Sequence, residues 1–154
     1  MSKIAVFPGS FDPITLGHVN IIERAMPLFD KIIIAIGVNS QKSGYFTLEQ
    51  RMNWLQEIYG STGNVVIESY EGLTVDFCKR QESKYILRGL RGVSDYEYER
   101  VIAQTNKTMY PEVETVFILS APEFSHISST IVREVLRHKG DISKLVPMVV
   151  NRGA

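Results

Sequence analysis

Short apolar runs alternate with longer mixed stretches along the whole chain. Several of the runs are continuously apolar and rich in β-branched residues, which is typical of strands covered on both faces of a parallel sheet. The strands are predicted at Ile4–Phe7, Lys31–Val38, Asn64–Ser69, Tyr85–Arg88 and Thr115–Leu119. The stretches between and after them predict helices at Gly17–Phe29, Leu48–Tyr59, Leu73–Gln81, Asp95–Met109 and Ser128–His138.

This alternation predicts βαβ units with right-handed crossovers. We therefore expect an α/β fold in which residues 1–154 form one domain, a doubly wound, Rossmann-like parallel five-stranded sheet with helices on both faces. In such sheets ligands bind beyond the carboxyl ends of the strands, where the strand order reverses. Thr47 followed by Gln50 predicts a capping box at one helix start, and the tail from Met148 is expected to fray.

Composition narrows the range of partners. Lys plus Arg equals Asp plus Glu at 17 each, so nothing global draws the chain toward nucleic acid or an anionic membrane. The longest apolar run, Ile32–Val38, is too short to span a bilayer, and no secretory signal is visible. The single cysteine, Cys78, excludes an intrachain disulfide and fits a reducing compartment, so we expect a cytoplasmic protein.

The first strand leads into a segment that is suited to phosphate. It reads Pro8-Gly9-Ser10-Phe11-Asp12-Pro13, followed by Thr15-Leu16-Gly17-His18. Small residues let the backbone approach a phosphate closely, and a helix start offers unpaired N–H groups and the positive end of the helix dipole. We predict that His18 donates a hydrogen bond to a reacting phosphate oxygen. The alternative is a turn followed by a helix-capping histidine.

The last strand leads into a second such segment, Ile127-Ser128-Ser129-Thr130-Ile131-Val132-Arg133. Hydroxyl residues are favoured at a helix start, where they and the N–H groups can share an anion. Arg133 lies about one turn further in, where it could support the site or form a surface ion pair. Taken alone, an ordinary serine cap is the simpler interpretation, but two such helix starts with a histidine and an arginine suggest a polyphosphate such as ATP.

Three more cations, Lys42, Arg88 and Arg91, fall where strands are predicted to end. Each could be a solvated surface charge, but together in a neutral protein they predict an anion pocket. Glu99 lies four residues after Asp95 on one helix face and could contact ribose, adenine or an arginine. The chain lacks a Gly-x-x-x-x-Gly-Lys loop, a Gly-x-Gly-x-x-Gly fingerprint, zinc-ligand spacing and a Gly-x-Ser-x-Gly elbow.

Thr15-x-Gly17-His18 together with Ile127-Ser128-Ser129-Thr130-x-x-Arg133 resembles the paired signature of the nucleotidyltransferase superfamily. Within it, the chain resembles the bacterial phosphopantetheine adenylyltransferase family over nearly its whole length. The intermediate landmarks are Lys42, Leu73–Phe77, and Arg88-Gly89-Leu90-Arg91 with Asp95-x-Glu97-Tyr98-Glu99. Residues 1–154 are accordingly expected to be a single nucleotidyltransferase domain.

The resemblance implies adenylyl transfer from ATP to 4′-phosphopantetheine, giving dephospho-coenzyme A and pyrophosphate, a step in coenzyme A biosynthesis. It also implies Mg²⁺ as the companion of ATP and a homohexamer, and it gives His18 the role of stabilising the transition state. The residues that would hold phosphopantetheine are Ser10, Lys42, Thr74 and Arg88. Those that would hold ATP are Ser10, Phe11, His18, Gly89, Leu90, Arg91, Glu99, Phe124, Ser125, His126, Ile127, Ser128, Ser129 and Thr130.

Two rival functions remain open. Another adenylyltransferase, such as one acting on nicotinate mononucleotide, would share both end motifs but would not be expected to have the block from Arg88 to Glu99. A non-catalytic nucleotide-binding regulator could keep both anion-binding helix starts, but it would have no reason to keep His18 with Lys42 and Arg88. One departure from the family pattern is Ser43-Gly44 after Lys42, where lysine and proline are common.

Overall fold

A computed structural model describes residues 2–154 and shows one sheet of five parallel strands in the order β3-β2-β1-β4-β5. The strands are β1 (Ile4–Gly9), β2 (Lys31–Gly37), β3 (Val65–Tyr70), β4 (Tyr85–Leu90) and β5 (Glu114–Leu119). The helices are α1 (Leu16–Ala25), α2 (Leu48–Tyr59), α3 (Thr74–Arg80), α4 (Val93–Met109), α5 (Ser129–Arg137) and α6 (Met148–Gly153), with short 3₁₀ turns η1 (Met26–Leu28) and η2 (Pro122–Phe124). The predicted α/β class and the five strands are confirmed.

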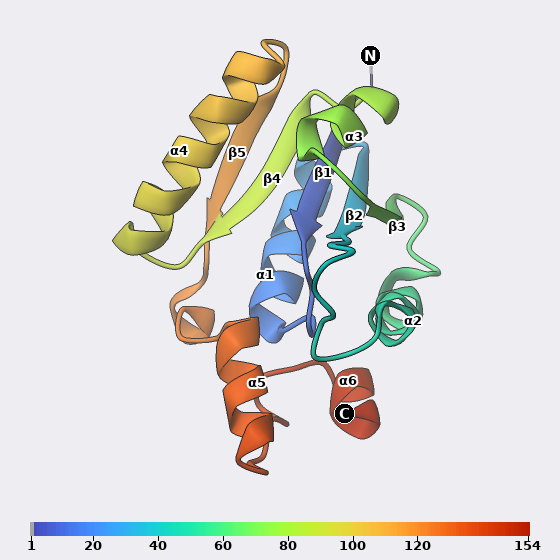
Figure 1. The fold of residues 1–154 in the computed structure, drawn as a ribbon, viewed down its shortest axis with the longest axis vertical. Coiled ribbons are helices and arrows are strands. Elements are labelled where there is room, and N and C mark those ends of the chain that lie inside the picture. The colour runs from blue at the N-terminus through green and yellow to red at the C-terminus, as the bar shows by residue number, and fades with distance from the viewer. Residues whose placement is uncertain (1) are drawn as a thin grey trace.

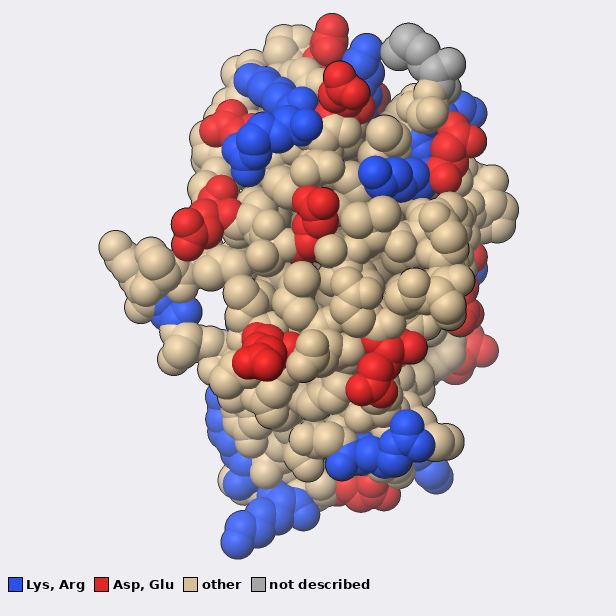
Figure 2. Space-filling model, turned by 90° about the vertical axis from the view of Figure 1, so that its right-hand side faces the viewer, with Lys and Arg blue, Asp and Glu red and all other residues tan. Residues whose placement is uncertain are grey.

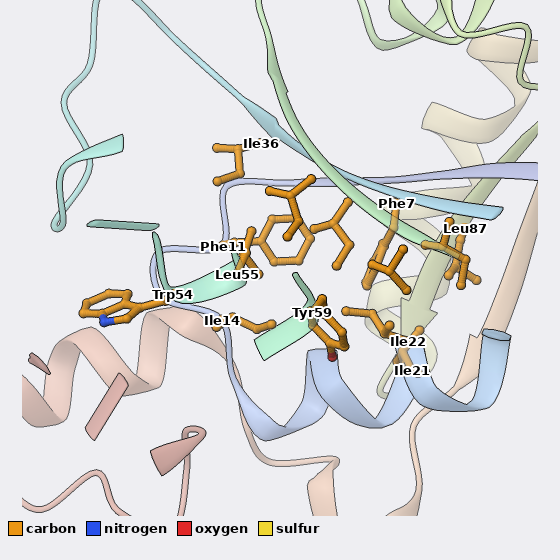
Figure 3. Packing of buried hydrophobic residues seen from close by; sticks show 14 of the residues in the cluster. Phe7, Phe11, Ile14, Ile21, Ile22, Ile36, Trp54, Leu55, Tyr59 and Leu87 are labelled. Atoms are coloured by element: carbon orange, nitrogen blue, oxygen red, sulfur yellow. The ribbon is translucent and has the colours of Figure 1, made fainter. Parts of the chain in front are cut away.

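Apolar side chains cover both faces of the sheet, because successive strand residues point to opposite sides. On one face, Phe7 and Leu87 pack with buried residues of α1, α2, α5 and α6. Figure 3 shows part of this cluster, with Phe7 from β1 near Ile22 from α1 and Tyr59 from α2. On the other face, the neighbouring strand residues pack against Phe77 and Cys78 of α3. The sheet is therefore wound on both sides.

The sheet opens between β1 and β4. β1 pairs with β2 along its whole length but with β4 only at Ala5 and Val6. Pro8 has no N–H to donate, and its carbonyl accepts a hydrogen bond from the Arg88 side chain instead. The strand order also reverses here, since β2 and β3 lie on one side of β1, and β4 and β5 on the other. In Figure 1 the carboxyl ends of the strands point down, toward α5 and α6.

Helix boundaries follow local chemistry. The helix predicted at Gly17–Phe29 ends at Ala25 and continues as the η1 turn, because Pro27 cannot donate to the helix ladder. The capping box of Thr47 and Gln50 is confirmed, with the Thr47 hydroxyl accepting from the Gln50 N–H and the Gln50 side chain accepting from the Thr47 N–H. The expectation of a fraying tail is wrong, since the tail forms α6 and buries Val150 completely.

Surface charge is mixed. On the face shown in Figure 2, basic and acidic side chains are interspersed around a broad uncharged area. Among residues 2–154, no helix combines the length and the hydropathy that crossing a bilayer requires. Helix α4 and the adjoining edge strand expose several large apolar side chains, namely Val93, Tyr98, Val101 and Leu119.

Candidate functional site

Two adjoining cavities lie where β1 and β4 separate. The first encloses about 350 Å³ and the second about 280 Å³. Their walls share Pro8, Gly9, Ser10, Arg88 and Glu99. The remaining wall of the first cavity consists of Phe7, Phe11, Thr15, Gly17, His18, Ile21, Gly89, Arg91, Asp95, Tyr98, Ser120, Ile127, Ser128 and Ser129. This is the edge of the sheet, and the point of strand reversal, where a doubly wound fold binds ligands.

The start of α1 fixes the imidazole of His18. Thr15 caps the helix, and its side chain accepts from the His18 N–H, while the ring Nδ1 of His18 lies 3.0 Å from the Thr15 backbone nitrogen. A backbone N–H can only donate, so Nδ1 is the acceptor and the neutral ring carries its hydrogen on Nε2. The capping box therefore leaves His18 with one N–H donor on the ring nitrogen that the box does not use. Helix capping and phosphate contact, taken as alternatives from the sequence, are compatible in one residue.

The surroundings of His18 keep it neutral. Burial, together with the positive charges of Arg88 and Arg91, lowers its pKa from 6.5 to about 4. The ring of Phe11 lies 4.9 Å from the imidazole, centroid to centroid. Phe11 has a φ of 46°, a left-handed conformation that is unusual for a bulky residue. A side chain on Gly9 would come within 3.1 Å of the Phe11 ring, so the glycine makes room for this packing.

Arg88 is held by Glu99 in the wall between the cavities. Its Nε and Nη2 lie 2.6 and 2.9 Å from the two carboxylate oxygens of Glu99, and its Nη1 donates to the Pro8 carbonyl. Glu99 is only 7% exposed. Since arginine has one N–H at Nε and two on each terminal nitrogen, one N–H on Nη1 and one on Nη2 remain for an anion. Of the partners considered for Glu99, the structure supports an arginine.

Arg91 and Asp95 form a second, more exposed ion pair at the N-terminal end of α4. The Arg91 side chain donates to both Asp95 oxygens at 2.9 and 3.0 Å, and the Arg91 backbone N–H adds a third contact. These hydrogen bonds hold the pKa of Asp95 below its usual range. Both residues line the first cavity. Asp95 thus orients a cation toward the cavity as well as favouring the start of its helix.

The two end segments meet at this site. Ser128 caps α5 by accepting from the Ile131 N–H, and the Ser129 hydroxyl donates to the Pro13 carbonyl at 2.8 Å. Arg133 donates to the Asp12 carbonyl at 2.8 Å and so supports the site from behind. It does not line either cavity. The stretch that carries His18 and the stretch that carries Ser128 are therefore joined by direct hydrogen bonds.

The second cavity lies between α3 and α4. The Tyr70 hydroxyl, at the carboxyl end of β3, is 2.8 Å from the Thr74 hydroxyl, and both residues line the cavity. One face of α4 forms the opposite wall with Glu99, Ile102, Ala103 and Asn106. The Thr115 hydroxyl is buried in this region and has no hydrogen-bond partner within the described chain. The cavity therefore combines apolar walls with a few hydroxyl and amide groups.

The structure brings most of the predicted residues together. Both cavities include Ser10, Arg88 and Glu99, the first adds Phe11, His18, Gly89, Arg91, Ile127, Ser128 and Ser129, and the second adds Thr74. Six predicted residues lie outside both walls, namely Lys42, Leu90, Phe124, Ser125, His126 and Thr130. Lys42 is exposed in the loop after β2.

Several wall residues were not anticipated. Ile102, Ala103 and Asn106 follow Glu99 by three, four and seven positions, which is the spacing of one helix face, so the sequence held a signal for them. Tyr98 lies three positions after Asp95 and four before Ile102, so the same spacing applies to it, whereas Ser120 carried no such signal. Among residues 2–154, no group of three or more acidic, cysteine or histidine side chains could hold a metal ion. The two carboxylates in the first cavity, Asp95 and Glu99, already pair with arginines.

Comparisons of the sequence identify its relatives. A cytidylyltransferase-like family model matches residues 6–135. A phosphopantetheine adenylyltransferase of Christiangramia forsetii is 53% identical over 150 residues, which cover 97% of this chain and 99% of that protein. The corresponding enzyme of Flavobacterium johnsoniae is 53% identical over 146 residues, which cover 95% of each chain.

Solved structures share the fold at lower identity. A protein assigned as a nicotinate-nucleotide adenylyltransferase from Vibrio parahaemolyticus superimposes with a TM-score of 0.70 at 20% identity, covering 99% of this chain and 91% of that one. The nicotinic acid mononucleotide adenylyltransferase of Plasmodium falciparum, in complex with NaAD, gives a TM-score of 0.69 at 19% identity, with coverage of 99% and 94%. At these identities the likeness establishes the architecture alone.

Proposed function

Because the chain belongs to the phosphopantetheine adenylyltransferase family, within the cytidylyltransferase-like group, we propose that it transfers the adenylyl group of ATP to 4′-phosphopantetheine. The products are dephospho-coenzyme A and pyrophosphate, and the reaction is a step in coenzyme A biosynthesis. The observation that carries the proposal is the pair of adjoining cavities that share Arg88. A transferase of this kind has to hold two substrates side by side with their phosphates in contact.

The reaction needs alignment and charge neutralisation more than a chemical nucleophile from the protein. A phosphate oxygen of phosphopantetheine attacks the α-phosphorus of ATP, a new P–O–P bond forms, and the bond to the β-phosphate breaks as pyrophosphate leaves. The acceptor phosphate is already nucleophilic, so no serine, cysteine or general base is required. Positioning and electrostatic stabilisation supply the catalysis.

We assign ATP to the first cavity. The Nε2–H of His18 donates to an oxygen of the α-phosphate and stabilises the charge that develops there. Because the ring is neutral with a pKa of about 4, it acts as a hydrogen-bond donor rather than as a cation. Arg91 and the start of α5 at Ser128–Thr130 take the β- and γ-phosphates, with Phe124–Ile127, Phe11 and Gly89–Leu90 around the nucleotide.

We assign phosphopantetheine to the second cavity. Its phosphate meets the two unused N–H groups of Arg88, and Lys42 reaches the same phosphate from the loop after β2. Ser10 faces both cavities and contacts both substrates. Thr74 contacts the pantetheine arm, whose amides match the hydroxyl and amide groups of this cavity and whose methyl groups match its apolar walls.

Mg²⁺ belongs to the proposal as part of the ATP substrate. The carboxylates of the first cavity are engaged by arginines, so the ion would be held by nucleotide phosphates and water, as is common for Mg²⁺. It would neutralise phosphate charge during the transfer. The proposal also includes a cytoplasmic location, in keeping with the single reduced cysteine, Cys78.

A homohexamer completes the proposal. The apolar side chains exposed on α4 and β5, among them Val93 and Leu119, support contact with other copies of the chain. Light scattering coupled to gel filtration should give six times the chain mass of 17.4 kDa. A mass that stays at one chain over a wide concentration range would contradict the hexamer.

Pyrophosphate release from ATP tests the proposed reaction. We expect release with 4′-phosphopantetheine and none above background with nicotinate mononucleotide. Release with nicotinate mononucleotide alone would favour the rival adenylyltransferase, and no release with either acceptor would favour a nucleotide-binding regulator. Arg88→Ala should raise the KM for phosphopantetheine or lower turnover, while Arg100→Ala, which removes an exposed arginine of α4, should change neither.

A further inference from the structure

Two buried charged residues beneath the site have no part in the proposed chemistry. Asp12 follows β1 and is 6% exposed, and Arg51 belongs to α2 and is 9% exposed. Their closest charged atoms, Asp12 Oδ1 and Arg51 Nε, are 4.0 Å apart. Burying two charges costs much of what their attraction returns, so such a pair is weak evidence for stability. The role of the pair is better shown by the groups to which its two side chains are hydrogen-bonded.

The Asp12 carboxylate anchors one end of the loop that carries Lys42. Its two oxygens accept from the backbone N–H groups of Tyr45 and Phe46, at 2.7 and 2.9 Å. The other end of the loop is fixed where the Val38 N–H donates to the Tyr70 carbonyl at 2.8 Å. Residues 39–44, which include Lys42, therefore span two fixed points, and one of the two is Asp12.

Arg51 holds the adjoining turn. Its Nη1 donates to the Ser10 carbonyl at 2.8 Å, and Ser10 lines both cavities. At Gly44, the loop backbone also packs directly against Asp12 and Arg51. A Cβ at this position would lie 3.0 Å from Asp12 Oδ2 and 3.2 Å from Arg51 Nη2, so the close approach requires a glycine or a displacement. The same glycine is one of the departures from the family pattern noted in the sequence.

We infer that Asp12 and Arg51 are positioning residues for the acceptor side of the site. Together they set the backbone of Ser10 and hold the base of the Lys42 loop against the turn that carries Ser10, without touching either substrate. The inference rests on the proposed acceptor site. It adds to that site a buried pair whose purpose is to fix the place of a cation that is otherwise exposed.

Asp12→Asn tests the role of the carboxylate with little change in shape. The amide group can accept only through one oxygen, so one of the two loop N–H groups loses its acceptor and meets an NH₂ group instead. We expect the KM for 4′-phosphopantetheine to rise about tenfold. The KM for ATP should change by less than about twofold, because the variant retains the Arg51 hydrogen bond to the Ser10 carbonyl and the Arg133 hydrogen bond to the backbone carbonyl of residue 12. Equal increases in both KM values, or no increase, would overturn the inference.

A double-mutant cycle with Lys42→Ala separates positioning from general destabilisation. If Asp12 acts by placing Lys42, then Asp12→Asn should add less than about a twofold increase in acceptor KM once Lys42 is gone. A full tenfold increase in both backgrounds would mean that Asp12 supports the fold without acting on the loop, and it would overturn the inference. Thermal unfolding of each variant shows how far stability has changed.

Gly44→Ala probes the same contact from the loop side and keeps the test available if Asp12→Asn does not fold. We expect a higher acceptor KM with an unchanged ATP KM, whereas Ser43→Ala, in the exposed neighbouring position, should behave like the wild type. Unchanged acceptor KM in Gly44→Ala would count against the inference. Failure of the proposed function would look different, because the wild-type chain would then release no pyrophosphate with phosphopantetheine.

Discussion

The starts of α1 and α5 look alike in sequence but offer a phosphate different groups. At α1 the Leu16 N–H donates to the Leu145 carbonyl and the His18 N–H donates to Thr15, so within residues 2–154 only the Gly17 N–H of the first turn is unpaired. At α5 the cap uses the Ile131 N–H, and the N–H groups of Ser129 and Thr130 have no partner in the described chain.

The difference assigns a separate task to each helix start. α1 uses its backbone donors internally and thereby presents one oriented imidazole N–H. α5 presents backbone N–H groups at the positive end of a helix, which suit an anion that carries more charge. In the proposed reaction, donors for the reacting phosphate and donors for the leaving pyrophosphate would thus come from opposite ends of the chain, and the Ser129–Pro13 and Arg133–Asp12 hydrogen bonds join the two helix starts.

The largest effect is expected at α1. His18→Ala removes the donor to the α-phosphate and should lower turnover by about 10²–10³-fold, as for other donors that act on a developing negative charge. Steady-state pyrophosphate release measures the loss, and His18→Gln, which keeps an N–H donor without a ring, should lose less. An alanine variant with turnover near that of the wild type would remove His18 from the reaction.

At α5 the backbone donors can be removed one at a time. Ser129→Pro deletes the first N–H while a proline remains compatible with the first helical position. Ser129→Ala is the matched control, because both variants lose the hydroxyl contact to Pro13 but only proline loses the N–H. We expect the KM for ATP to be about tenfold higher in the proline variant than in the alanine variant. Equal values would show that this N–H does not bind the nucleotide.

The neutral imidazole at α1 predicts a pH effect on stability. Burial and two arginines lower the pKa of His18 to about 4. As the pH falls, the imidazole is therefore protonated near pH 6.5 in the unfolded chain but only near pH 4 in the folded chain. Stability should therefore fall as the pH drops from about 6.5 to about 4, by up to about 3 kcal/mol from this group.

Urea unfolding across this pH range should show that the free energy of unfolding falls with pH in the wild type and falls less in His18→Gln. In parallel, an NMR titration should give a His18 ring signal, identified by its absence from the variant, that does not shift between pH 8 and pH 5.5. A midpoint near 6.5 for that signal would contradict the half-buried, neutral ring.

The smallest effect concerns the arginine behind α5. Arg133→Met loses the hydrogen bonds to the Asp12 carbonyl and the Thr130 hydroxyl, and it should lower stability by about 1–2 kcal/mol. Turnover should stay within about threefold of the wild type, because Arg133 lies outside both cavities. Arg137→Met, at an exposed position of the same helix, is the control. A large loss of turnover in Arg133→Met alone would mean that this arginine binds phosphate.

The sequence predicted the sheet, and most of the site residues that it predicted line the cavities, because both depend on local patterns. Apolar runs give the strands, and the carboxyl ends of parallel strands bring Ser10, Arg88 and Arg91 to one edge. The sequence was less able to predict which side chains pair with each other within the site. Whether Glu99 meets Arg88 or a ligand depends on side-chain directions that spacing does not fix.

The buried Asp12–Arg51 pair was missed for a similar reason. A single arginine within a helix is typical of a solvated face, and only the packing of α2 against the β1 turn shows that Arg51 is buried. The exposed position of Lys42 also depends on tertiary structure, since its loop has no regular secondary structure to set its direction. Local patterns therefore located the site, while the contacts that hold its side chains came from the fold.

A crystal structure with ATP bound, in the absence of acceptor, would decide whether the two helix starts serve one triphosphate. We expect His18 Nε2 within hydrogen-bond distance of an α-phosphate oxygen, and the N–H groups of Ser129 and Thr130 on the β- or γ-phosphate of the same molecule. A triphosphate that contacts only one of these helix starts, with the other facing solvent, would contradict their joint role.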